Sequence, residues 1–494
     1  MNSAFFSRPL ATAALLGDLA PDRHLFTDKR VLITGESAIL LTANGRECFL
    51  NSLRLVVRFC SNVAVLVPRE CTGLGEESRA LADRIKFAHA IDFPDSGSHL
   101  DSFDAILAVG SMPRPELPWT VINCNGWLAR VSSVKTQIDA RCDQYNPIGA
   151  LAAASLGAGE VFKRLIALKP ERGALIDGLS FSMLSYSQSS DPGPALPARL
   201  PVGFMVVVGV GAIGNGNVHL LSRLPIQGRL AIVDPQKFRG ENLGTSLLVG
   251  PQDLNSNKAE FAARVLESVV EAKPYAEDFS TFRERLGVEL PYPEFMLTGL
   301  DNIEARHAVQ ELWPSQIIDG ATGDFGCQAS CHPWGADVAC LKCLFRAPAG
   351  ESAESVAIRV TGLAGERVKH PTETISEDDV RNAPKEKQDW LKARVGVQIC
   401  SVIQEAVAQD LSSERLREGF APSVPFVACF SASMEVGELV KSVTGVATPL
   451  APRFQFDFLR GPGFGDLFPQ SRRATCVCVT RKRNIEAIRA KRVR

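Results

Sequence analysis

The sequence predicts an α/β protein in which two Rossmann-like halves follow one another. The first observation is a segment at 204–258, which opens with an apolar β-branched run, turns on glycines, continues as a helix and returns to a second apolar strand ending at Asp234. This order is typical of a βαβ nucleotide-binding unit. The second is an alternation of strand-like and helix-like runs over 30–200, which indicates a mostly parallel sheet. The third is a helix followed by a strand that occurs once in each half.

The glycine turn of the second half has the composition of a phosphate-binding loop. Gly209 and Gly211 let the backbone turn tightly and approach a phosphate, and Gly214 lets the helix pack closely on the strand. Asp234 lies twenty residues after Gly214, where a carboxylate can accept hydrogen bonds from ribose hydroxyls. Taken alone, this pattern fits an NAD-dependent oxidoreductase as readily as an ATP-binding protein.

The residues after Asp234 favour ATP. They are Asn242-Leu243, Lys258 and, after the apolar run FMLTGL, Asp301-Asn302. The series resembles the ThiF/HesA/MoeB superfamily of activating enzymes, which includes the ubiquitin-activating enzymes. The resemblance continues in Ile318-Asp319-Gly320-Ala321 and in CLKCLF, and it covers roughly residues 200–345 and 424–460.

The resemblance implies roles for these residues. ATP would be held by Gly209, Gly211, Gly214 and Asp234, its phosphates by Asn242 and Lys258, and a magnesium ion by Asp301 next to Asn302. The chain departs from the family at Thr245, where an arginine three residues after the Asn usually contacts the terminal phosphates. Arg239 is a candidate substitute.

The bulk properties exclude several classes of protein. A formal charge of −1 over 494 residues argues against nucleic acid as a partner. Arg8, Pro9 and Asp18 interrupt the mildly apolar N-terminus before it reaches signal-peptide or membrane length, so we expect a cytoplasmic protein without a membrane partner. Thirteen scattered cysteines favour metal ligands, a catalytic thiol or reduced thiols over disulfides.

The first half, 1–185, carries no usable nucleotide site. Only Gly35 follows its first strand, and Gly110-Ser111 stands where the second half has Asp301-Asn302. Both halves nevertheless carry a related helix, with Gly159-Glu160-Val161-Phe162-Lys163 in one and Gly437-Glu438-Leu439-Val440-Lys441 in the other. We interpret them as tandem copies, although two unrelated Rossmann-like domains would give a similar pattern.

An inactive adenylation half followed by an active one resembles the ubiquitin-activating enzymes of the eukaryotic type. In such enzymes a short Ser-Arg motif of the inactive half reaches the ATP site, and Phe6-Ser7-Arg8-Pro9-Leu10 resembles it, so Arg8 would neutralise phosphate charge. An exposed terminal arginine without a role is the alternative.

We expect a Ser-, Pro- and Gly-rich linker at 186–203, an active adenylation half at 204–345 and 424–478, a crossover insertion at 346–423 and a basic tail at 479–494. In the family this insertion carries the catalytic cysteine, and here that is Cys400. Ser401 and Gln404 form a capping-box pattern, which predicts Cys400 just before the first turn of a helix, where free N–H groups favour a thiolate. A buried cysteine on one continuous helix is the alternative.

A zinc site is predicted from two short cysteine motifs. Cys340 and Cys343 form CxxC, Cys476 and Cys478 form CxC, and four thiolates can close a tetrahedral structural zinc site. Cys327, Cys331 and His332 lie close by and are interpreted as incidental. His219 and His307 fall on predicted helices and are interpreted as structural. Arg306 could either reach the nucleotide or brace its helix.

Together these features predict ATP-dependent activation of a ubiquitin-like protein. Its C-terminal glycine would be adenylated, transferred to Cys400 as a thioester and passed to a conjugating enzyme. The compact length resembles the activating enzymes of bacterial ubiquitin-like conjugation operons, some of them linked to antiviral defence. A sulfur-carrier-protein adenylyltransferase and a catalytically degenerate ThiF-fold scaffold are the alternatives.

Overall fold

The structure is a computed structural model of the 494-residue chain. It describes residues 9–10, 12–13, 26–86, 91–94, 99–323, 325–335, 337–345, 353–410, 424–446, 453–461 and 471–492. The chain divides into two compact units, a main unit of Met1–Leu344 with Ser423–Arg494 and an insert of Phe345–Pro422. Arg8, the candidate for a phosphate-neutralising arginine, lies outside the described residues.

The first half of the main unit is built on a mixed seven-stranded sheet in the order β2-β1-β3-β4-β5-β6-β7. The first four strands in this order are parallel to one another, and β5, β6 and β7 each pair antiparallel with the strand before them. The strands are the apolar runs of the sequence: β1 (Arg30–Gly35), β2 (Asn62–Val65), β3 (Ala105–Val109), β4 (Trp119–Asn125), β5 (Leu128–Ser132), β6 (Leu179–Ser182) and β7 (Ser187–Gln188).

The helices of this half are α2 (Ser37–Leu40), α3 (Ala43–Val56), α4 (Thr72–Ile85) and α5 (Pro147–Leu165). Local capping sets two of the starts: Thr42 Oγ1 accepts from Gly45 N (3.0 Å) before α3, and Asn146 Oδ1 accepts from Ile148 N (3.0 Å) before α5. A 3₁₀ turn at Arg69–Cys71 leads directly into α4.

The second half is built on a sheet of the same size, in the order β10-β9-β8-β11-β12-β13-β14. Its strands are β8 (Leu200–Val208), β9 (Ile226–Val233), β10 (Glu271–Tyr275), β11 (Phe295–Thr298), β12 (Gln316–Gly323), β13 (Gly326–Pro333) and β14 (Arg453–Asp457). The helices are α6 (Ala212–Leu221), α7 (Lys258–Leu266), α8 (Phe279–Arg285), α9 (Ile303–Gln310), α10 (Leu341–Leu344), α16 (Pro425–Thr444), α17 (Val477–Thr480) and α18 (Lys482–Arg492).

The two sheets share a strand plan. β1 and β8 each have a parallel neighbour on one side and, on the other, two parallel strands followed by antiparallel ones. The antiparallel strands are three in the first sheet and two in the second, and the second sheet has the additional parallel strand β10 beyond β9. A single parallel bridge between Ala64 and Asp92 lies where the second sheet has β10. The α/β prediction is therefore confirmed, with two mixed sheets of seven strands each.

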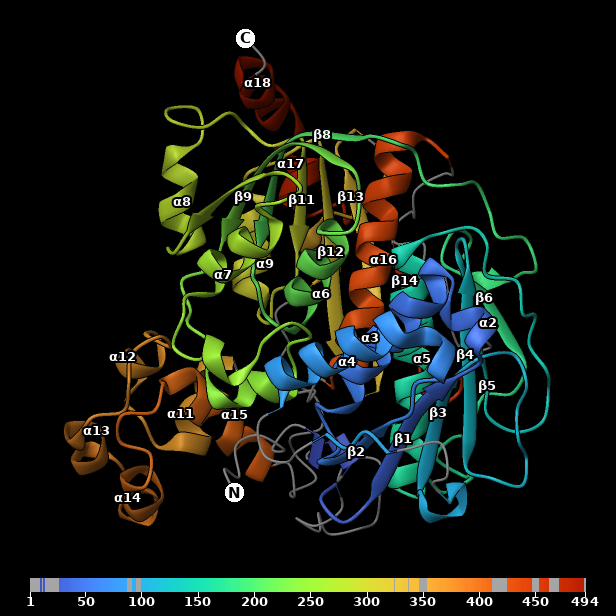
Figure 1. Ribbon diagram of the computed structural model, residues 1–494. Coiled ribbons are helices and arrows are strands. Elements are labelled where there is room, and N and C mark those ends of the chain that lie inside the picture. Colours follow the sequence, from blue (N-terminus) through green and yellow to red (C-terminus); the bar gives the residue numbers. More distant parts are fainter. Residues whose placement is uncertain are drawn as a thin grey trace. The chain divides into compact units, whose positions relative to one another are not determined.

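The related helices α5 and α16 pack against one another between the halves (Figure 1). Each carries a buried ion pair one turn long, Lys163 with Glu160 and Lys441 with Glu438. Lys163 Nζ donates to the carbonyl of Phe458 in the second half (2.9 Å), and the hydroxyl of Tyr186 in the first half donates to Glu438 Oε1 (2.8 Å). Each half thus contributes a polar group to the ion pair of the other.

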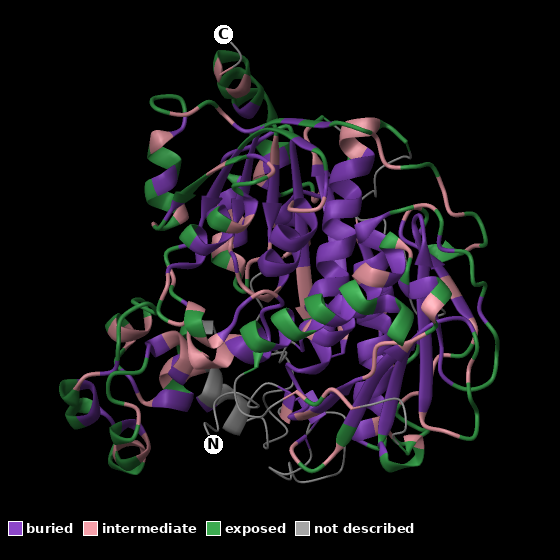
Figure 2. Cartoon of the chain, in the orientation of Figure 1, coloured by how far each residue is buried: buried purple, intermediate pink, exposed green. Residues whose placement is uncertain are grey.

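Aromatic rings fill the space around these helices. Phe162 of α5 lies 5.3–5.6 Å, centroid to centroid, from rings of both halves: Phe26, Phe59, Phe325 and Phe426. The inner strands of both sheets and both central helices are buried (Figure 2). One hydrophobic core therefore runs through both halves.

The insert is helical where it is described. Its helices are α11 (Ala353–Thr361), α12 (Gly365–Val368), α13 (Glu377–Asn382), α14 (Lys385–Lys392) and α15 (Ile399–Asp410), around a small core of its own that includes Leu363, Leu391 and Ile399. No helix in the described parts of the chain is long and apolar enough to cross a membrane.

Candidate functional site

The glycine turn lies between β8 and α6, as predicted. Gly209 has a φ of +86°, which favours glycine, and a Cβ on Gly214 would lie 2.0 Å from the carbonyl oxygen of Gly209. Gly211 is different, because no described atom lies within 4 Å of the position its Cβ would take. The fold therefore requires Gly209 and Gly214, whereas Gly211 leaves open space in front of the first N–H groups of α6.

Asp234 follows β9 and ties the turn together. Its Oδ2 accepts from Val210 N (2.7 Å) and its Oδ1 from Gln236 N (2.8 Å). A carboxylate has about four lone-pair positions, so each oxygen keeps one for a further donor such as a ribose hydroxyl. The sequence did not predict the bond to Val210, which makes Asp234 a part of the turn as well as a candidate ribose ligand.

Lys258 begins α7 and is almost fully buried. Its Nζ donates to Gln236 Oε1 (2.7 Å). Asn257 caps the helix, accepting from Ala259 N (2.8 Å), and donates through Nδ2 to the carbonyl of Asp234 (3.2 Å). The ammonium group is therefore held at Gln236, three residues after the end of β9.

Asn242 lies in a 3₁₀ turn, Gly240–Gly244, and its Oδ1 accepts from Arg239 N (2.8 Å). Thr245 is 1% exposed and belongs to the interior of this loop. The guanidinium of the half-buried Arg239 keeps its Nε buried, with no hydrogen-bond partner among the described residues. The Thr245 hydroxyl donates to the carbonyl of Asn242 (3.5 Å), so of these two residues Arg239 is the one with a side-chain donor left unused among the described residues.

Asp301 and Asn302 follow β11 and are exposed. Asn302 caps α9 by accepting from Ala305 N (2.7 Å) and donates through Nδ2 to Asp301 Oδ1 (3.2 Å). Arg306, left open between two roles, is buried and pairs with Asp319 (3.1 Å), so it braces β12 from α9. The Asp301 carboxylate is available to a cation, and the Arg306 guanidinium is held by the fold.

A second buried carboxyl group, that of Glu435, lies near the carboxyl group of Asp319. Glu435 of α16 accepts from Asn217 Nδ2 (2.7 Å), and a Cβ on Gly320 would collide with its Oε1. Burial, and then the neighbouring Asp319, raise the pKa of Glu435 well above its usual range. No local pattern predicts this pair, because Asp319 and Glu435 are brought together by the packing of α16 on β12.

The corresponding edge of the first half is closed by its own side chains. Glu36 follows β1 directly, as Gly209 follows β8, and its Oε1 accepts from Ser111 N (2.7 Å) and Met112 N (3.2 Å). The predicted match of Gly110-Ser111 to Asp301-Asn302 is wrong by two residues, since Met112 stands three residues past β3 as Asp301 stands three past β11. A carboxylate in this place disfavours phosphate.

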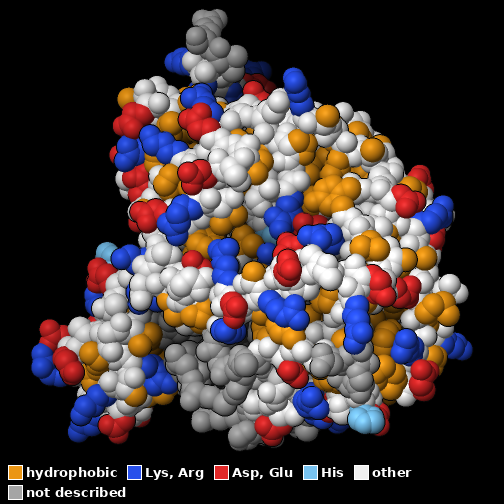
Figure 3. All heavy atoms as spheres, viewed as in Figure 1, with side chains coloured by type: hydrophobic (Ala, Val, Ile, Leu, Met, Phe, Trp, Pro, Cys, Tyr) orange, Lys and Arg blue, Asp and Glu red, His pale blue; other side chains and the backbone are white. Residues whose placement is uncertain are grey.

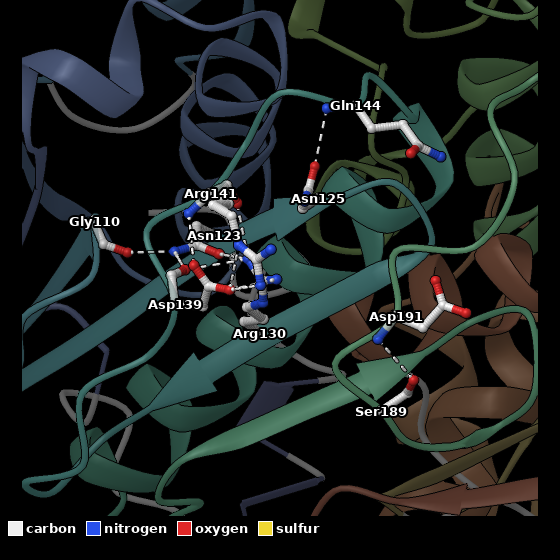
Figure 4. A network of polar contacts seen from close by, with 9 residues as sticks. All are labelled: Gly110, Asn123, Asn125, Arg130, Asp139, Arg141, Gln144, Ser189 and Asp191. Carbon is white, nitrogen blue, oxygen red and sulfur yellow. Dashed lines mark hydrogen bonds and ion pairs between the residues drawn. The ribbon is translucent and has the colours of Figure 1, made fainter.

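Further along the same edge, a polar network orders the loop after β5 (Figure 4). Arg130 donates to the carbonyl of Arg141 (2.8 Å) and to Asn123 Oδ1 (3.3 Å), and Asn123 Nδ2 donates to the carbonyl of Gly110 (2.8 Å). Hydrogen bonds from Arg141 lower the pKa of Asp139 to about 2. The network connects strand ends to one another and leaves no cationic group directed at a ligand among the residues drawn.

The four cysteines of the predicted zinc site meet, although more than 130 residues separate the two motifs. Their sulfur atoms all lie within 4.8 Å of one another, with separations of 3.7 Å for Cys340 to Cys343 and to Cys476, and 3.5 Å for Cys343 to Cys478. A tetrahedron with Zn–S bonds of about 2.3 Å has sulfur atoms about 3.8 Å apart. The shortened CxC motif therefore supplies a geometry that fits zinc.

The residues near this cluster that we interpreted as incidental stay outside it. His332 bonds to the carbonyl of Ala339 (2.6 Å) and to Ser330 Oγ (2.9 Å), and Cys331 Sγ donates to Glu438 Oε2 (3.4 Å). His219 is buried, as a structural role predicts, but both ring nitrogens lack a hydrogen-bond partner among the described residues, and burial lowers its pKa well below the usual range.

Cys400 is the second residue of α15, and α15 begins at Ile399. The predicted capping box is therefore wrong, since Ser401 lies inside the first turn instead of before it. The helix starts earlier because Ile399 N and Cys400 N donate to the carbonyls of Glu373 and Pro371 (2.8 and 2.9 Å). Cys400 is half-buried, whereas each of the other twelve cysteines is buried.

The basic tail is partly docked. Ile485 of α18 is buried, and Arg489 and Arg492 donate to main-chain carbonyls after α9, those of Leu312, Trp313 and Pro314. Elsewhere, acidic and basic side chains are interspersed over the face drawn in Figure 3. That mixture agrees with the near-zero net charge.

Comparison with known proteins places this architecture in a family. Residues 30–179 match the BilD N-terminal domain. The uncharacterized protein y4jF of Sinorhizobium fredii (strain NBRC 101917 / NGR234) is 31% identical over 261 residues, 50% of this chain and 48% of that protein. The chain thus spans about half the length of the curated relative it matches.

Among solved structures, E. coli MccB with ATP is 14% identical, over 56% of this chain and 67% of that chain, with a TM-score of 0.34. E. coli MccB with succinimide is 13% identical, over 56% and 66%, with a TM-score of 0.36. Residues 195–478, more than half of the 494, match the ThiF family, and the chain belongs to the ThiF family.

Proposed function

We propose that this protein uses ATP to adenylate the C-terminal glycine of a ubiquitin-like protein, forms a thioester with it at Cys400 and passes it to a conjugating enzyme. The observation that carries the proposal is the edge of the second sheet. There the open glycine turn, Asp234 and the exposed Asp301 carboxylate follow β8, β9 and β11, which are neighbouring parallel strands, and Lys258 Nζ bonds to Gln236 just after β9. Such an edge is where open α/β sheets bind nucleotides.

The chain's own residues supply binding and charge. The N–H groups that open α6 face the space beside Gly211 and suit an anion, and Lys258 adds a full positive charge. In the reaction, a carboxylate oxygen of the terminal glycine attacks the α-phosphorus, the bond to the bridging oxygen breaks and pyrophosphate leaves. Positioning and charge neutralisation carry most of this step.

Arg239 would take the place of the arginine missing at Thr245. Its buried Nε with no partner among the described residues suits a phosphate oxygen, which would satisfy a donor that the protein leaves unused. Asp301 would hold Mg²⁺, because an exposed carboxylate is a ligand that this ion prefers. When bound, Mg²⁺ would reduce the negative charge on the phosphates.

Cys400 is the best-suited nucleophile for the second step. It is half-buried, the other cysteines are buried, and it lies in the first turn of α15, where the helix dipole favours a thiolate. Its sulfur would attack the carbonyl carbon of the acyl-adenylate, and AMP would leave as the C–S bond forms. The four-cysteine cluster would hold a structural zinc ion that fastens the C-terminal helices to the second half.

In this arrangement the first half is an adenylation-like unit without a nucleotide site, closed by Glu36. Its match to the BilD N-terminal domain supports a bacterial ubiquitin-like system as the setting. The ubiquitin-like partner and the conjugating enzyme are part of the proposal.

The test incubates the full chain with Mg·ATP and a panel of ubiquitin-like proteins ending in glycine. Adenylation is followed by exchange of labelled pyrophosphate into ATP, and the thioester by a non-reducing gel. We expect Asp301→Asn to lose exchange, and Cys400→Ala to keep exchange and lose the thiol-sensitive band. Cys400→Ser should give a band that resists thiols, because an ester replaces the thioester.

Cys71→Ala is the matched control, a cysteine of the first half whose loss should leave both signals unchanged. A band that persists in Cys400→Ala would refute the cysteine assignment. Exchange without any thiol-sensitive band would favour a sulfur-carrier adenylyltransferase. Neither signal with any partner of the panel would favour a binding scaffold.

A further inference from the structure

The first half reaches into the second through one buried arginine. Arg58 follows α3 and is 0% exposed. Its Nη1 donates to the carbonyls of Leu243 (2.8 Å) and Val249 (2.6 Å), and its Nη2 to the carbonyl of Leu247 (3.0 Å). All three carbonyls belong to one segment, 242–250, which begins with Asn242 of the candidate nucleotide site.

The guanidinium shape explains why an arginine stands here. Its Nε donates to the carbonyl of Arg54 one turn back (3.2 Å), which orients the planar group along the end of α3. The two Nη atoms then meet three carbonyls that converge from different parts of the loop. Burial lowers the pKa of Arg58 to about 9, so the group stays charged at neutral pH and interacts strongly with the carbonyl dipoles.

The same loop is bound from the other side by the second half. Leu248 N donates to Asn215 Oδ1 (2.7 Å), and Asn215 lies in the first turns of α6, directly after the glycine turn. At the end of the loop, a Cβ on Gly250 would lie 2.2 Å from the carbonyl oxygen of Arg84 in the first half. The loop is therefore clamped between α6 and two points of the first half.

We propose that Arg58 is a positioning residue for adenylation: from the first half, it fixes the loop that carries Asn242 and Thr245 against the glycine turn of the second. This inference rests on the proposed function for its effect on ATP. The first half, which has no nucleotide site of its own, thereby takes part in the nucleotide site of the other. Arg58 itself contacts main-chain carbonyls and no ligand.

The test compares Arg58→Met and Arg58→Lys with Lys163→Met. Lys163 is the matched control, since it too is a buried cation of the first half that donates to a carbonyl of the second, at Phe458, away from the loop. Hydrogen exchange of a peptide spanning 240–250 reports the loop without ATP. The rise in Tm caused by Mg·ATP and the KM for ATP report the nucleotide site.

We expect Arg58→Met to speed exchange of the loop amides at least tenfold and to raise the KM for ATP at least tenfold. Arg58→Lys should give smaller changes of both, because one ammonium cannot reach three divergent carbonyls. Lys163→Met should lower the Tm and leave loop exchange and the KM for ATP within twofold of the unchanged protein.

The inference would be overturned if the loop amides of Arg58→Met exchanged within twofold of the rate in the unchanged protein. It would also be overturned if Lys163→Met raised the KM for ATP as much as Arg58→Met does. Should Arg58→Met not fold, the same comparison is made with Arg58→Lys, which keeps the charge. Failure of the proposed function can be told apart from failure of this inference. If the unchanged protein shows no pyrophosphate exchange, the proposed function fails, but hydrogen exchange of the loop can still be compared between the variants.

Discussion

Replacing Lys163 by Met tests whether the two halves are held together by the buried ion pairs of their central helices. Lys163 and Glu160 have side chains that are 0% exposed, and Lys163 Nζ also donates to the carbonyls of Ala174 (2.8 Å) and Phe458 (2.9 Å). The substitution leaves a carboxyl group in the interior without its cation. Breaking a buried pair in this way costs about 3–5 kcal/mol.

That cost can be read as a change in Tm. Unfolding entropy of about 2.1 cal/mol/K per residue, over a main unit of roughly 400 residues, gives about 0.9 kcal/mol/K, so the Tm should fall by about 3–6 °C. Lys135→Met, the same change at an exposed lysine, should alter stability by less than about 0.5 kcal/mol. Thermal unfolding followed by circular dichroism and tryptophan fluorescence measures both.

The pH dependence gives a second, independent signature. Burial raises the pKa of Glu160, and Lys163 opposes this shift. Without Lys163 the folded state favours protonated Glu160 more strongly, so the penalty is smallest near the unfolded pKa of about 4.3 and grows as pH rises. The Tm of Lys163→Met should therefore fall further below that of the unchanged protein at pH 8 than at pH 5.5.

The double variant Glu160→Gln/Lys163→Met completes the cycle. It removes the uncompensated carboxylate but does not restore the hydrogen bonds to the carbonyls of Ala174 and Phe458. It should therefore recover about half of the fall in Tm caused by Lys163→Met. A Tm within 1 °C of Lys135→Met, or a penalty independent of pH, would refute the reasoning.

Three further predictions concern other parts of the main unit. Cys478→Ala should lose about one bound zinc ion per chain, measured by a colorimetric chelator, whereas Cys327→Ala, a buried thiol outside the cluster, should keep it; a metal-free unchanged protein would contradict the site. Phe162→Ala should cost about 3–5 kcal/mol in urea unfolding because it opens a cavity among rings of both halves, and a loss below 1 kcal/mol would contradict the shared core. Asp177 accepts from Ser132, Val134, Lys135 and Thr136, and although burial opposes them these bonds lower its pKa, so its contribution is present above the unfolded pKa of about 3.9 and lost below it. Asp177→Asn should accordingly flatten the Tm between pH 6 and 3.5, and an unchanged slope would contradict this.

Local patterns carried much of the fold prediction. The apolar run before Gly209 and the glycine spacing predict β8, the turn and α6, because hydrophobic periodicity and backbone freedom act over a few residues. Where a boundary depends on contacts from elsewhere, the prediction is wrong. Ser401 has the sequence of a helix cap, but carbonyls of the segment before α13 draw Ile399 and Cys400 into the helix first.

The sequence alone determines the βαβ unit, the order of candidate ligands along it and the lack of a glycine-rich turn after the first strand of the first half, because each depends on residues close together in the chain. Only the tertiary structure decides that CxC and CxxC meet, that Glu36 closes the first half and that Arg58 holds a loop 185 residues away. These contacts arise from the path of the whole chain around a shared core. No local periodicity encodes which distant carbonyls a buried guanidinium will meet.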